Sequence, residues 1–309
     1  MIALADVQAA RERIAPHVRV TPVLHWRDDC WLKLEQLQHS GSFKARGACN
    51  RLFAVGDAAL RAGVVTASGG NHGLGVAWAA ARRGAQATVY LPERAPQSTA
   101  ARLGELGAKV IRHGRDWDDA WTVAVEHAKA EGALLVHPFE DAEVIAGQGT
   151  IGVELLEQLG RVDVAVIAIG GGGLIGGVAL ALKSLAPAVR VVGVEPTGAT
   201  AMKDSLAAGR LIALERVDTI AGTLAPRAVG PNTLALAARY VDDVVLVSDD
   251  ELRAAMRRLW LEARILVEPA GAAAVAAVAG GHVATAGQRV AVLVCGANFD
   301  PAMAAAALG

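Results

Sequence analysis

The chain has 309 residues, enough for one large or two modest domains, and 53% of them are hydrophobic while only 20% are charged. Its formal net charge of −1 disfavours a nucleic-acid partner, because nucleic-acid binding needs a basic face. The three cysteines, Cys30, Cys49 and Cys295, lie far apart and form neither a CxxC metal motif nor an even-numbered disulfide set, so we expect a reduced, cytoplasmic protein.

The N-terminal stretch, residues 1–16, is typical of a capped amphipathic helix. It lacks the order of basic, apolar and small residues that marks a signal peptide. No apolar run reaches the length of a membrane span without an interrupting glycine or charge, so no membrane association is expected. The Ala-rich segment 270–281 is interpreted as a buried helix.

Short apolar runs alternate with helical patterns along the chain. The candidate strands are residues 31–35, 64–68, 87–91, 109–113, 134–138, 164–169, 189–195, 244–248 and 289–295. The helical patterns between them cover 43–55, 75–84, 97–107, 121–132, 149–160 and 174–185. This alternation predicts an α/β protein with parallel sheets covered on both faces. No Pro/Ser-rich linker divides the chain, so two domains would be interleaved and not consecutive.

The first chemically distinctive stretch is GSFKARGA (41–48), which places Lys44 just past a strand and at the start of a helix. Most lysines are solvated surface residues. Here, however, the neighbours are the small Gly41 and Ser42 and the aromatic Phe43. A lysine that is desolvated near an anion site can act as an amine nucleophile or a proton carrier.

The next stretch is SGGNHG (68–73), on the turn between strand 64–68 and helix 75–84. Two interpretations are open. One is a tight turn, for which the two glycines suffice. The other is a loop whose backbone and whose Asn71 side chain hold a ligand.

A glycine run, GGGGLIGG (170–177), follows strand 164–169 and opens a helix. Backbone N–H groups at a helix N-terminus can bind an oxyanion without any positive side chain. The alternative is a turn that allows close helix–sheet packing, but four successive glycines are conformationally costly. The sequence therefore favours phosphate binding here.

The same run contains a G-x-G-x-x-G match at Gly171, Gly173 and Gly176, and Glu195 ends the following strand. That pattern is also typical of a dinucleotide-binding dehydrogenase. An amine at Lys44 together with a phosphate site favours pyridoxal phosphate, an aldehyde cofactor carried as a Schiff base. Spacing alone leaves both interpretations open.

Six motifs taken together resemble the fold-type II pyridoxal-phosphate enzymes, in the threonine/serine dehydratase and serine racemase branch. They occur in the family's order at 31–48, 68–73, 137–158, 170–177, 265–272 and 295–298, and the resemblance runs from 11–23 to 294–300. A dinucleotide dehydrogenase would explain only one of the six and is a remote alternative.

The resemblance implies a fold like that of the tryptophan synthase β chain, with two doubly wound parallel-sheet domains and the cofactor between them. Residues 1–44 and 141–309 would form the larger domain. Residues 45–140 would form a smaller inserted domain that carries the Asn71 loop. The family is usually dimeric or larger, so a homodimer is expected.

The resemblance also assigns cofactor contacts. Lys44 matches the Schiff-base lysine, which also moves the Cα proton, Phe43 matches the residue that packs on the ring, and Asn71 matches the asparagine at the ring 3′-oxygen. The other implied contacts are Gly170, Gly171, Gly172, Gly173 and Leu174 at the phosphate, Glu268 near the ring, and Cys295 at the pyridine nitrogen. From the residues alone, Glu268 could instead cap the helix that follows it.

For the substrate, an amino acid, the resemblance implies that the loop with Ser68, Gly69, Asn71 and His72 holds the carboxylate. Backbone donors suit a carboxylate for the same reason that they suit a phosphate. His137 and Phe139 are expected near the substrate side chain, although either could be simple packing.

A thiol at Cys295 is a weak donor and would not keep the pyridine nitrogen protonated, which favours prompt loss of a β leaving group. We therefore expect β-elimination of L-threonine or L-serine to a 2-oxo acid and ammonia. A racemase needs a second proton carrier, but its serine is replaced by Gly69 and an arginine it uses aligns with Ala120. Amino-acid racemisation, or dehydration of 3-hydroxyaspartate or phenylserine, remains the alternative.

A cation site is a further expectation from the resemblance. Glu195, with a carbonyl at Ala199 and a group at position 201, matches a family position that can bind a monovalent or divalent cation. Position 201 is Ala, which weakens the case for Mg²⁺ because Mg²⁺ prefers charged oxygens or water. A strand-end glutamate without a metal contact is the competing interpretation.

Overall fold

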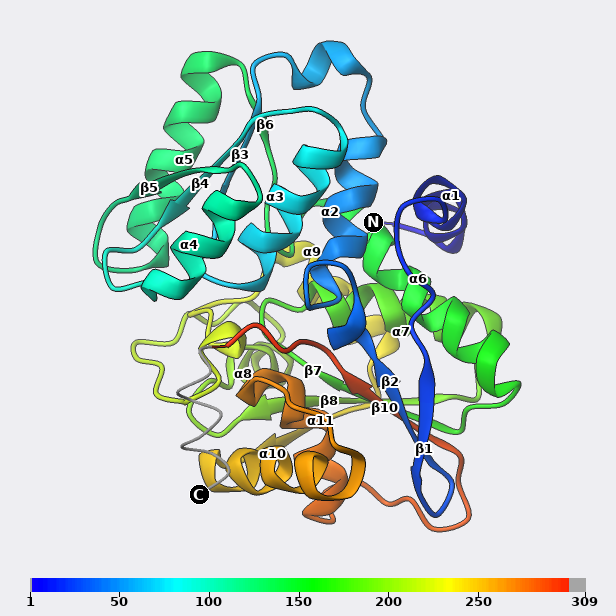
Figure 1. The fold of residues 1–309 in the computed structure, drawn as a ribbon. Coiled ribbons are helices and arrows are strands. Elements are labelled where there is room, and N and C mark those ends of the chain that lie inside the picture. Colours follow the sequence, from blue (N-terminus) through cyan, green and yellow to red (C-terminus); the bar gives the residue numbers. More distant parts are fainter. Residues whose placement is uncertain (1, 300–309) are drawn as a thin grey trace.

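In the computed structural model, which describes residues 2–299, the strands form a six-stranded and a four-stranded sheet (Figure 1). The larger sheet has the order β1-β2-β10-β7-β8-β9. Its strands are β1 (Val23–Arg27), β2 (Cys30–Leu34), β7 (Val164–Ala168), β8 (Arg190–Pro196), β9 (Asp243–Val247) and β10 (Val290–Val294). The smaller sheet has the order β5-β4-β3-β6, with β3 (Val64–Ala67), β4 (Ala87–Leu91), β5 (Lys109–Arg112) and β6 (Leu134–Leu135).

Helices cover both faces of the larger sheet, with α6 and α7 on one side and α10 and α11 on the other (Figure 1). The described helices are α1 (Leu4–Ile14), α2 (Lys44–Phe53), α3 (Asn71–Arg82), α4 (Gln97–Glu105), α5 (Trp117–Glu131), α6 (Ala142–Leu159), α7 (Gly173–Leu185), α8 (Ala201–Ala208), α9 (Pro231–Tyr240), α10 (Asp249–Ala263) and α11 (Pro269–Ala279). Short 3₁₀ turns add η1 (Glu35–Leu37), η2 (Asp57–Leu60) and η3 (Gly222–Leu224). Within residues 2–299, no helix is long and apolar enough to cross a bilayer.

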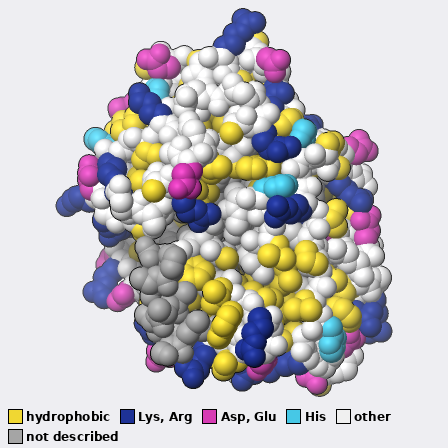
Figure 2. Space-filling view, in the orientation of Figure 1, with side chains coloured by type: hydrophobic (Ala, Val, Ile, Leu, Met, Phe, Trp, Pro, Cys, Tyr) yellow, Lys and Arg dark blue, Asp and Glu magenta, His cyan; other side chains and the backbone are white. Residues whose placement is uncertain are grey.

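The α/β class and the parallel sheets predicted from the sequence are confirmed. Every residue of β7 and of β10 is buried, which explains why these strands are continuous apolar runs and do not alternate. The Ala-rich segment forms α11, whose residues from Pro269 to Val278 are all buried. Figure 2 shows hydrophobic side chains gathered over the half of the molecule that contains the larger sheet, with Lys and Arg side chains scattered over both halves.

Three features differ from the expectation. The strand predicted over 134–138 covers only Leu134–Leu135, because the chain turns where His137 Nδ1 accepts the amides of Phe139 and Glu140. The predicted set of strands lacked β1, which pairs with β2 as an antiparallel edge strand, so the larger sheet is not wholly parallel. The predicted set of helices had no counterpart of α8 and α9.

A buried ion network joins β2, η1, α2 and α6. The guanidinium of Arg46 donates to Glu35 at 2.8 Å and to Glu154 at 2.6 Å, and Lys33 Nζ donates to Glu154 at 2.7 Å. The four side chains are at most 9% exposed. Because Arg46 lies two residues after Lys44, the network fixes the first turn of the helix that carries this lysine.

The carboxyl ends of several parallel strands lead into helices that begin at one place. β3 is followed by the loop that starts α3, and β7 is followed by the glycine run that starts α7. In open α/β sheets, ligands bind in the crevice outside the carboxyl ends of the strands. The fold thus brings the two loops singled out in the sequence to the same edge.

Candidate active site

A cavity of about 820 Å³ lies at this edge and takes its lining from loops of both sheets. The first residues of five α-helices line it, namely Lys44 of α2, Asn71 of α3, Trp117 of α5, Gly173 of α7 and Pro269 of α11. Helix N-termini present unpaired N–H groups and the positive end of the helix dipole. The cavity therefore suits a ligand with more than one negatively charged group.

Lys44 places a primary amine in the cavity. It is half-buried, its Nζ donates to the Pro138 carbonyl at 2.5 Å, and it lies 5.2 Å from the centre of the Phe43 ring. Burial lowers the pKa of Lys44 to about 8. At neutral pH this amine is therefore unprotonated far more often than an ordinary lysine, and the neutral amine is the nucleophilic form.

The four glycines of residues 170–173 leave their loop without side chains at the start of α7. The helix has no side-chain cap, so its first amides remain available to a ligand. Gly172 has φ of +91°, a left-handed conformation that favours glycine. A Cβ at Gly171 would lie 2.2 Å from the Phe139 ring, and one at Gly173 would lie 3.0 Å from the Phe139 backbone. The loop is thus shaped for backbone contact with an oxyanion.

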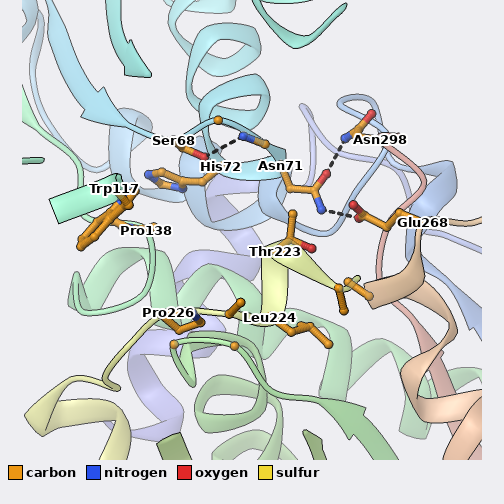
Figure 3. Close-up of a pocket in the computed structure, with 18 of the residues that line it drawn as sticks. Ser68, Asn71, His72, Trp117, Pro138, Thr223, Leu224, Pro226, Glu268 and Asn298 are labelled. Carbon is orange, nitrogen blue, oxygen red and sulfur yellow. Dashed lines mark hydrogen bonds between the residues drawn. The ribbon is translucent and has the colours of Figure 1, made fainter. Parts of the chain in front are cut away.

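Asn71 stands between two other residues of the cavity, as Figure 3 shows. Its Nδ2 donates to Glu268 at 2.5 Å, and its Oδ1 accepts from Asn298 Nδ2 at 2.7 Å. Burial raises the pKa of Glu268 to about 7, although the bond from Asn71 opposes the shift. Glu268 occupies the N-cap position of α11, but its side chain makes no capping hydrogen bond and bonds Asn71 instead.

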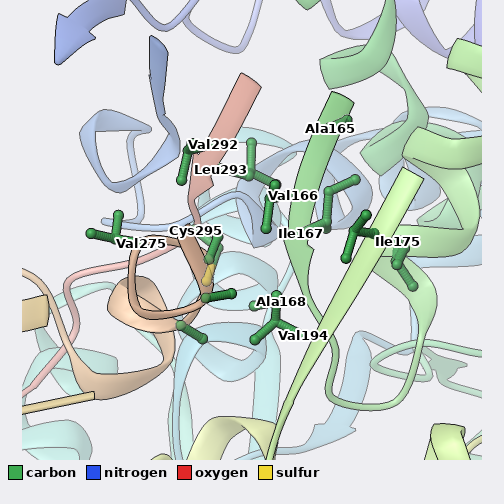
Figure 4. Close-up of a cluster of buried hydrophobic side chains, with 14 of the residues drawn as sticks. Ala165, Val166, Ile167, Ala168, Ile175, Val194, Val275, Val292, Leu293 and Cys295 are labelled. Carbon is green, nitrogen blue, oxygen red and sulfur yellow. The ribbon is translucent and has the colours of Figure 1, made fainter. Parts of the chain in front are cut away.

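Cys295 follows β10 at the end of the hydrophobic core and faces the cavity (Figure 4). Its Sγ donates to the Ala270 carbonyl at 3.4 Å. Burial, reinforced by the Glu268 carboxylate, raises the pKa of Cys295 far above its ordinary value. At neutral pH the residue therefore offers a neutral thiol, which is a weak hydrogen-bond donor.

The loop before α3 forms the opposite wall of the cavity. Ser68 Oγ accepts the Gly70 amide at 3.3 Å, and no side chain caps α3. His72 is buried, its Nε2 lies 3.3 Å from the Val136 carbonyl oxygen, and its Nδ1 has no partner among the described residues. Burial, followed by Lys44, lowers the pKa of His72 well below its usual range, so the ring is neutral.

Most residues predicted for the site meet in the cavity. Its lining includes Phe43, Lys44, Ser68, Gly69, Asn71, His72, Phe139, Gly170, Gly171, Gly172, Gly173, Leu174, Glu268 and Cys295. His137 is not part of the lining and packs behind Phe139, with ring centres 4.6 Å apart. Ala120 is fully buried in the core beside β3 and β4.

Glu195 and Ala199 lie away from the cavity. The Glu195 carboxylate accepts the amides of Met202 and Lys203 at 2.8 and 2.9 Å, so it caps α8. Burial raises the pKa of Glu195 to about 7. Because the Glu195 carboxylate is occupied by these two amides, it is not available to bind the ribose of a dinucleotide, as the dehydrogenase interpretation required. Within residues 2–299, no group of three or more His, Cys, Asp and Glu side chains could hold a metal ion.

The sequence assigned no role to three further lining residues, Asn298, Trp117 and Thr223. For Asn298 the sequence did contain a clue to a role in the site, because this residue belongs to the CGAN motif at 295–298. Trp117 opens α5 after a capping aspartate, and Thr223 lies in η3, within a long stretch without periodic pattern. Neither position is distinctive in the sequence alone.

The donor set fits the cofactor that the sequence predicts. A dianionic phosphate suits the uncapped glycine loop of α7, and an aldehyde suits the half-buried amine of Lys44. A second uncapped helix start, at residues 68–72, remains for a substrate carboxylate.

Comparison with known proteins agrees with this fit. The family described as "Pyridoxal-phosphate dependent enzyme" matches residues 14–296. An L-threonine ammonia-lyase of Thermotoga maritima is 40% identical over 97% of this chain and 76% of its own length. A phenylserine dehydratase of Ralstonia pickettii is 41% identical over 99% of this chain and 96% of its own.

Among solved structures, maize serine racemase superimposes with a TM-score of 0.93 at 35% identity, covering 97% of this chain and 95% of the racemase. Lyases and a racemase thus share this fold, and the fold alone does not separate the two reactions. The match to the family extends over both sheets and includes every lining loop from Phe43 to Cys295. The chain therefore belongs to the pyridoxal-phosphate dependent enzymes of fold type II, in the branch of the threonine/serine dehydratases and serine racemases.

Proposed function

We propose that this protein catalyses β-elimination of a β-hydroxy amino acid such as L-threonine or L-serine, releasing a 2-oxo acid and ammonia. The observation that carries the proposal is the half-buried Lys44 between two uncapped helix N-termini, one for a phosphate and one for a carboxylate. Pyridoxal phosphate, when bound, supplies an aldehyde that joins an amine and a ring that withdraws electrons from Cα.

For the cofactor, we propose that Gly170, Gly171, Gly172 and Gly173, with Leu174, hold the phosphate through backbone amides. Phe43 would pack on the ring and Asn71 would face the ring oxygen, while Glu268 holds Asn71 through its hydrogen bond. Cys295, a neutral thiol because burial raises its pKa, would lie at the pyridine nitrogen. The chain thus places a weak donor at a position where a carboxylate would hold a proton.

In the reaction, Lys44 removes the Cα proton as a neutral amine, and its lowered pKa favours that form. The amides of the loop 68–72 hold the substrate carboxylate and orient the Cα–H bond toward this amine. Loss of the proton and of the β-hydroxyl leaves an enamine, which becomes the 2-oxo acid and ammonia in water.

A panel of β-hydroxy amino acids, scored by 2-oxo acid and ammonia release from the holoenzyme, tests the function. We expect equimolar release of both products from at least one member. If no member releases either product while the cofactor is fully bound, the proposed function is wrong and a non-catalytic binding role would replace it.

Gly172→Ala is expected to weaken cofactor binding. Its Cβ would lie 2.6 Å from Met202 Cε and 2.8 Å from Thr233 Cβ, at a φ of +91°. Strain of this kind costs about 1–3 kcal/mol, and the displaced loop also loses its contacts, so we expect the Kd for pyridoxal phosphate to rise about tenfold or more. Titration of the apoenzyme, followed by fluorescence, measures this Kd.

The matched control is Gly132→Ala. Gly132 also has a positive φ, of +68°, but nothing lies within 4 Å of its Cβ position. It ends α5, and we expect the Kd to stay unchanged in this variant. An equal rise in the two variants would mean that the glycine loop has no special role at the phosphate.

The missing side chain at Gly69 favours elimination over racemisation, because racemisation needs a second proton carrier at Cα. A Cβ at this position would meet only Ala95 Cβ, at 3.4 Å, and Pro92 Cδ, at 4.0 Å, which are ordinary contacts. Gly69→Ser is therefore expected to fold normally and to place a hydroxyl in the cavity. Because a positioned acid–base group contributes about 10²–10⁴-fold, we expect the ratio of D-serine to pyruvate formed from L-serine to rise by about 10²-fold.

Chiral chromatography of the products measures this ratio. Gly69→Ala adds the same Cβ without the hydroxyl and is expected to leave the ratio at the unmodified level. If the unmodified enzyme already forms D-serine as fast as pyruvate, the preference for elimination is wrong.

We also propose that residues 45–140 form the smaller domain and that residues 1–44 and 141–309 form the larger one, of which 300–309 lie outside the described residues. Supporting this division, all four strands from β3 to β6 fall within 45–140.

We further propose that the protein is cytoplasmic, because Cys30, Cys49 and Cys295 are unpaired. We also propose that it is a homodimer, because large hydrophobic residues, including Val20, are exposed. Sedimentation analysis tests the dimer, and localisation of a tagged chain tests the compartment.

A monovalent cation at the Glu195 carboxylate and the Ala199 carbonyl is a secondary proposal. The support for this proposal is that the buried Glu195 carboxylate lies next in the chain to the turn in which the Ala199 amide donates to the Pro196 carbonyl. The two bonds that this carboxylate makes to α8 compete with such an ion. Equal activity in potassium and tetramethylammonium salts would contradict a functional cation.

A further inference from the structure

We propose that the preferred substrates carry an aromatic ring on the β-carbon and that Trp117 and Phe139 hold this ring. The inference rests on the proposed β-elimination and names its substrate class. It starts from the wall of the cavity that contains these two side chains.

The two rings line the cavity and remain partly exposed to it. Their centres are 6.4 Å apart and their planes are inclined by 32°, so neither ring closes over the other. Aromatic pairs prefer offset or edge-to-face contacts with centres about 4.5–7 Å apart. A third ring that enters the cavity can therefore contact both within this range.

This wall lies next to the reacting group. The carbonyl that accepts from Lys44 Nζ belongs to Pro138, the residue before Phe139. The Phe139 ring also packs against Gly171, where a Cβ would lie 2.2 Å from it. A substrate whose Cα is near Lys44 thus has aromatic surface available beside its β-carbon.

The aromatic wall is held rigidly from behind. Trp117 Nε1 donates to the Ala67 carbonyl at 2.9 Å, and its indole stacks on Trp121, with ring centres 5.4 Å apart and planes inclined by 12°. His137 fills the space between Trp121 and Phe139, at 4.7 and 4.6 Å from their ring centres. Such preorganisation reduces the entropy lost when a ligand ring binds.

The side chains that line the cavity from the η3 segment do not favour a charged substrate side chain. Ile220, Leu224 and Pro226 line the cavity from the η3 segment. The lining arginines of that segment, Arg216 and Arg227, are exposed and already donate to Asp218 and to the Leu214 carbonyl. On this side of the cavity a second substrate carboxylate, as in 3-hydroxyaspartate, would therefore meet apolar surface, while the lining Arg94 belongs to the loop between β4 and α4.

The experiment compares kcat/KM of the holoenzyme for L-phenylserine, L-threonine, L-serine and 3-hydroxyaspartate, with 2-oxo acid release as the signal. We expect phenylserine to exceed the others by about tenfold or more, the effect of one to two favourable ring contacts. In Trp117→Leu we expect kcat/KM for phenylserine to fall about tenfold, while the value for threonine changes less than about twofold.

Two further variants separate ring contact from general damage. Trp117→Phe keeps a ring in the wall and should retain most of the phenylserine activity. Trp121→Leu removes the ring behind Trp117, and Trp121 is not part of the described lining, so its kcat/KM values should change less than those of Trp117→Leu.

The outcomes also separate this inference from the proposed function. Turnover of threonine or serine at a higher kcat/KM than phenylserine would overturn the aromatic preference and leave β-elimination intact. An equal loss for threonine and phenylserine in Trp117→Leu would assign Trp117 a structural role and would also overturn the inference. Absence of 2-oxo acid from all four substrates would overturn the proposed function itself.

Discussion

Replacing Lys44 with alanine is expected to lower kcat for β-elimination by about 10⁴-fold and to remove the absorbance band that arises when the cofactor is joined to this lysine. Lys44 is the lysine of the cavity lining, and its Nζ contacts the Pro138 carbonyl next to the glycine loop. Without this amine the site has no group that both joins the aldehyde and takes the Cα proton. Single-turnover assays and absorbance spectra of the purified variant measure the two losses.

Lys44→Arg is the matched control for charge. Arginine keeps a positive group at this position but does not lose its proton in proteins, so this variant should be as inactive as the alanine variant. Circular dichroism should show an unchanged fold in both, since the side chain at position 44 lines a cavity of about 820 Å³ and does not fill the core. Full turnover in Lys44→Ala would show that the mechanism proposed above is wrong.

The largest expected effect on stability comes from Arg46→Met. Arg46 is fully buried and donates to Glu35, Glu154 and Thr150, so its removal leaves two buried carboxylates without their main partner. Breaking a buried ion pair by removing one partner costs about 3–5 kcal/mol. We expect the free energy of unfolding, measured by urea denaturation of the apoenzyme, to fall by this amount.

A surface pair provides the comparison. Arg161 pairs with Asp163 at 2.7 Å, but its side chain is 69% exposed. Exposed ion pairs contribute about 0–1 kcal/mol, so Arg161→Met should change the unfolding free energy by no more than that. A loss below 1 kcal/mol in Arg46→Met would mean that the two carboxylates find other partners and that the network does not anchor α2.

The parts of the site that sequence reasoning located are those that depend on neighbours in the chain. Lys44 at the start of α2 and the glycine run at the start of α7 each combine a strand end, small residues and a helix start within about ten residues. Their geometry follows from local rules for helix N-termini. The loop 68–73 before α3 is of the same kind, and all three line one cavity.

The contacts that the sequence did not reveal join distant segments. Asn298 and Asn71 are hydrogen-bonded although they are 227 positions apart. Glu268 was open to interpretation as a helix cap, because its position before α11 is typical of one, yet Asn71 draws the carboxylate away. Trp117 carries no local signal, since its place in the wall depends on the Ala67 carbonyl at the end of β3.

Among the secondary-structure elements, too, those that depend on local composition were predicted and those that depend on distant or irregular contacts were not. The buried strands β7 and β10 were predicted to within about a residue at each end, because both faces are covered and the composition is apolar throughout. The edge strand β1 has a mixed, half-exposed pattern and depends on a tight turn in which Asp28 has φ of +46°. For α9 a signal did exist, because Pro231 stands at its first turn.

The open space beside Gly69 also bears on how enzymes of this fold diverge. An added Cβ there meets only ordinary contacts, so a hydroxyl-bearing residue can be acquired without repacking the cavity wall. A lineage can therefore gain or lose the second proton carrier in a single substitution while its stability stays the same. On this scaffold, the second proton carrier that racemisation needs can therefore be gained at one position without a change of fold.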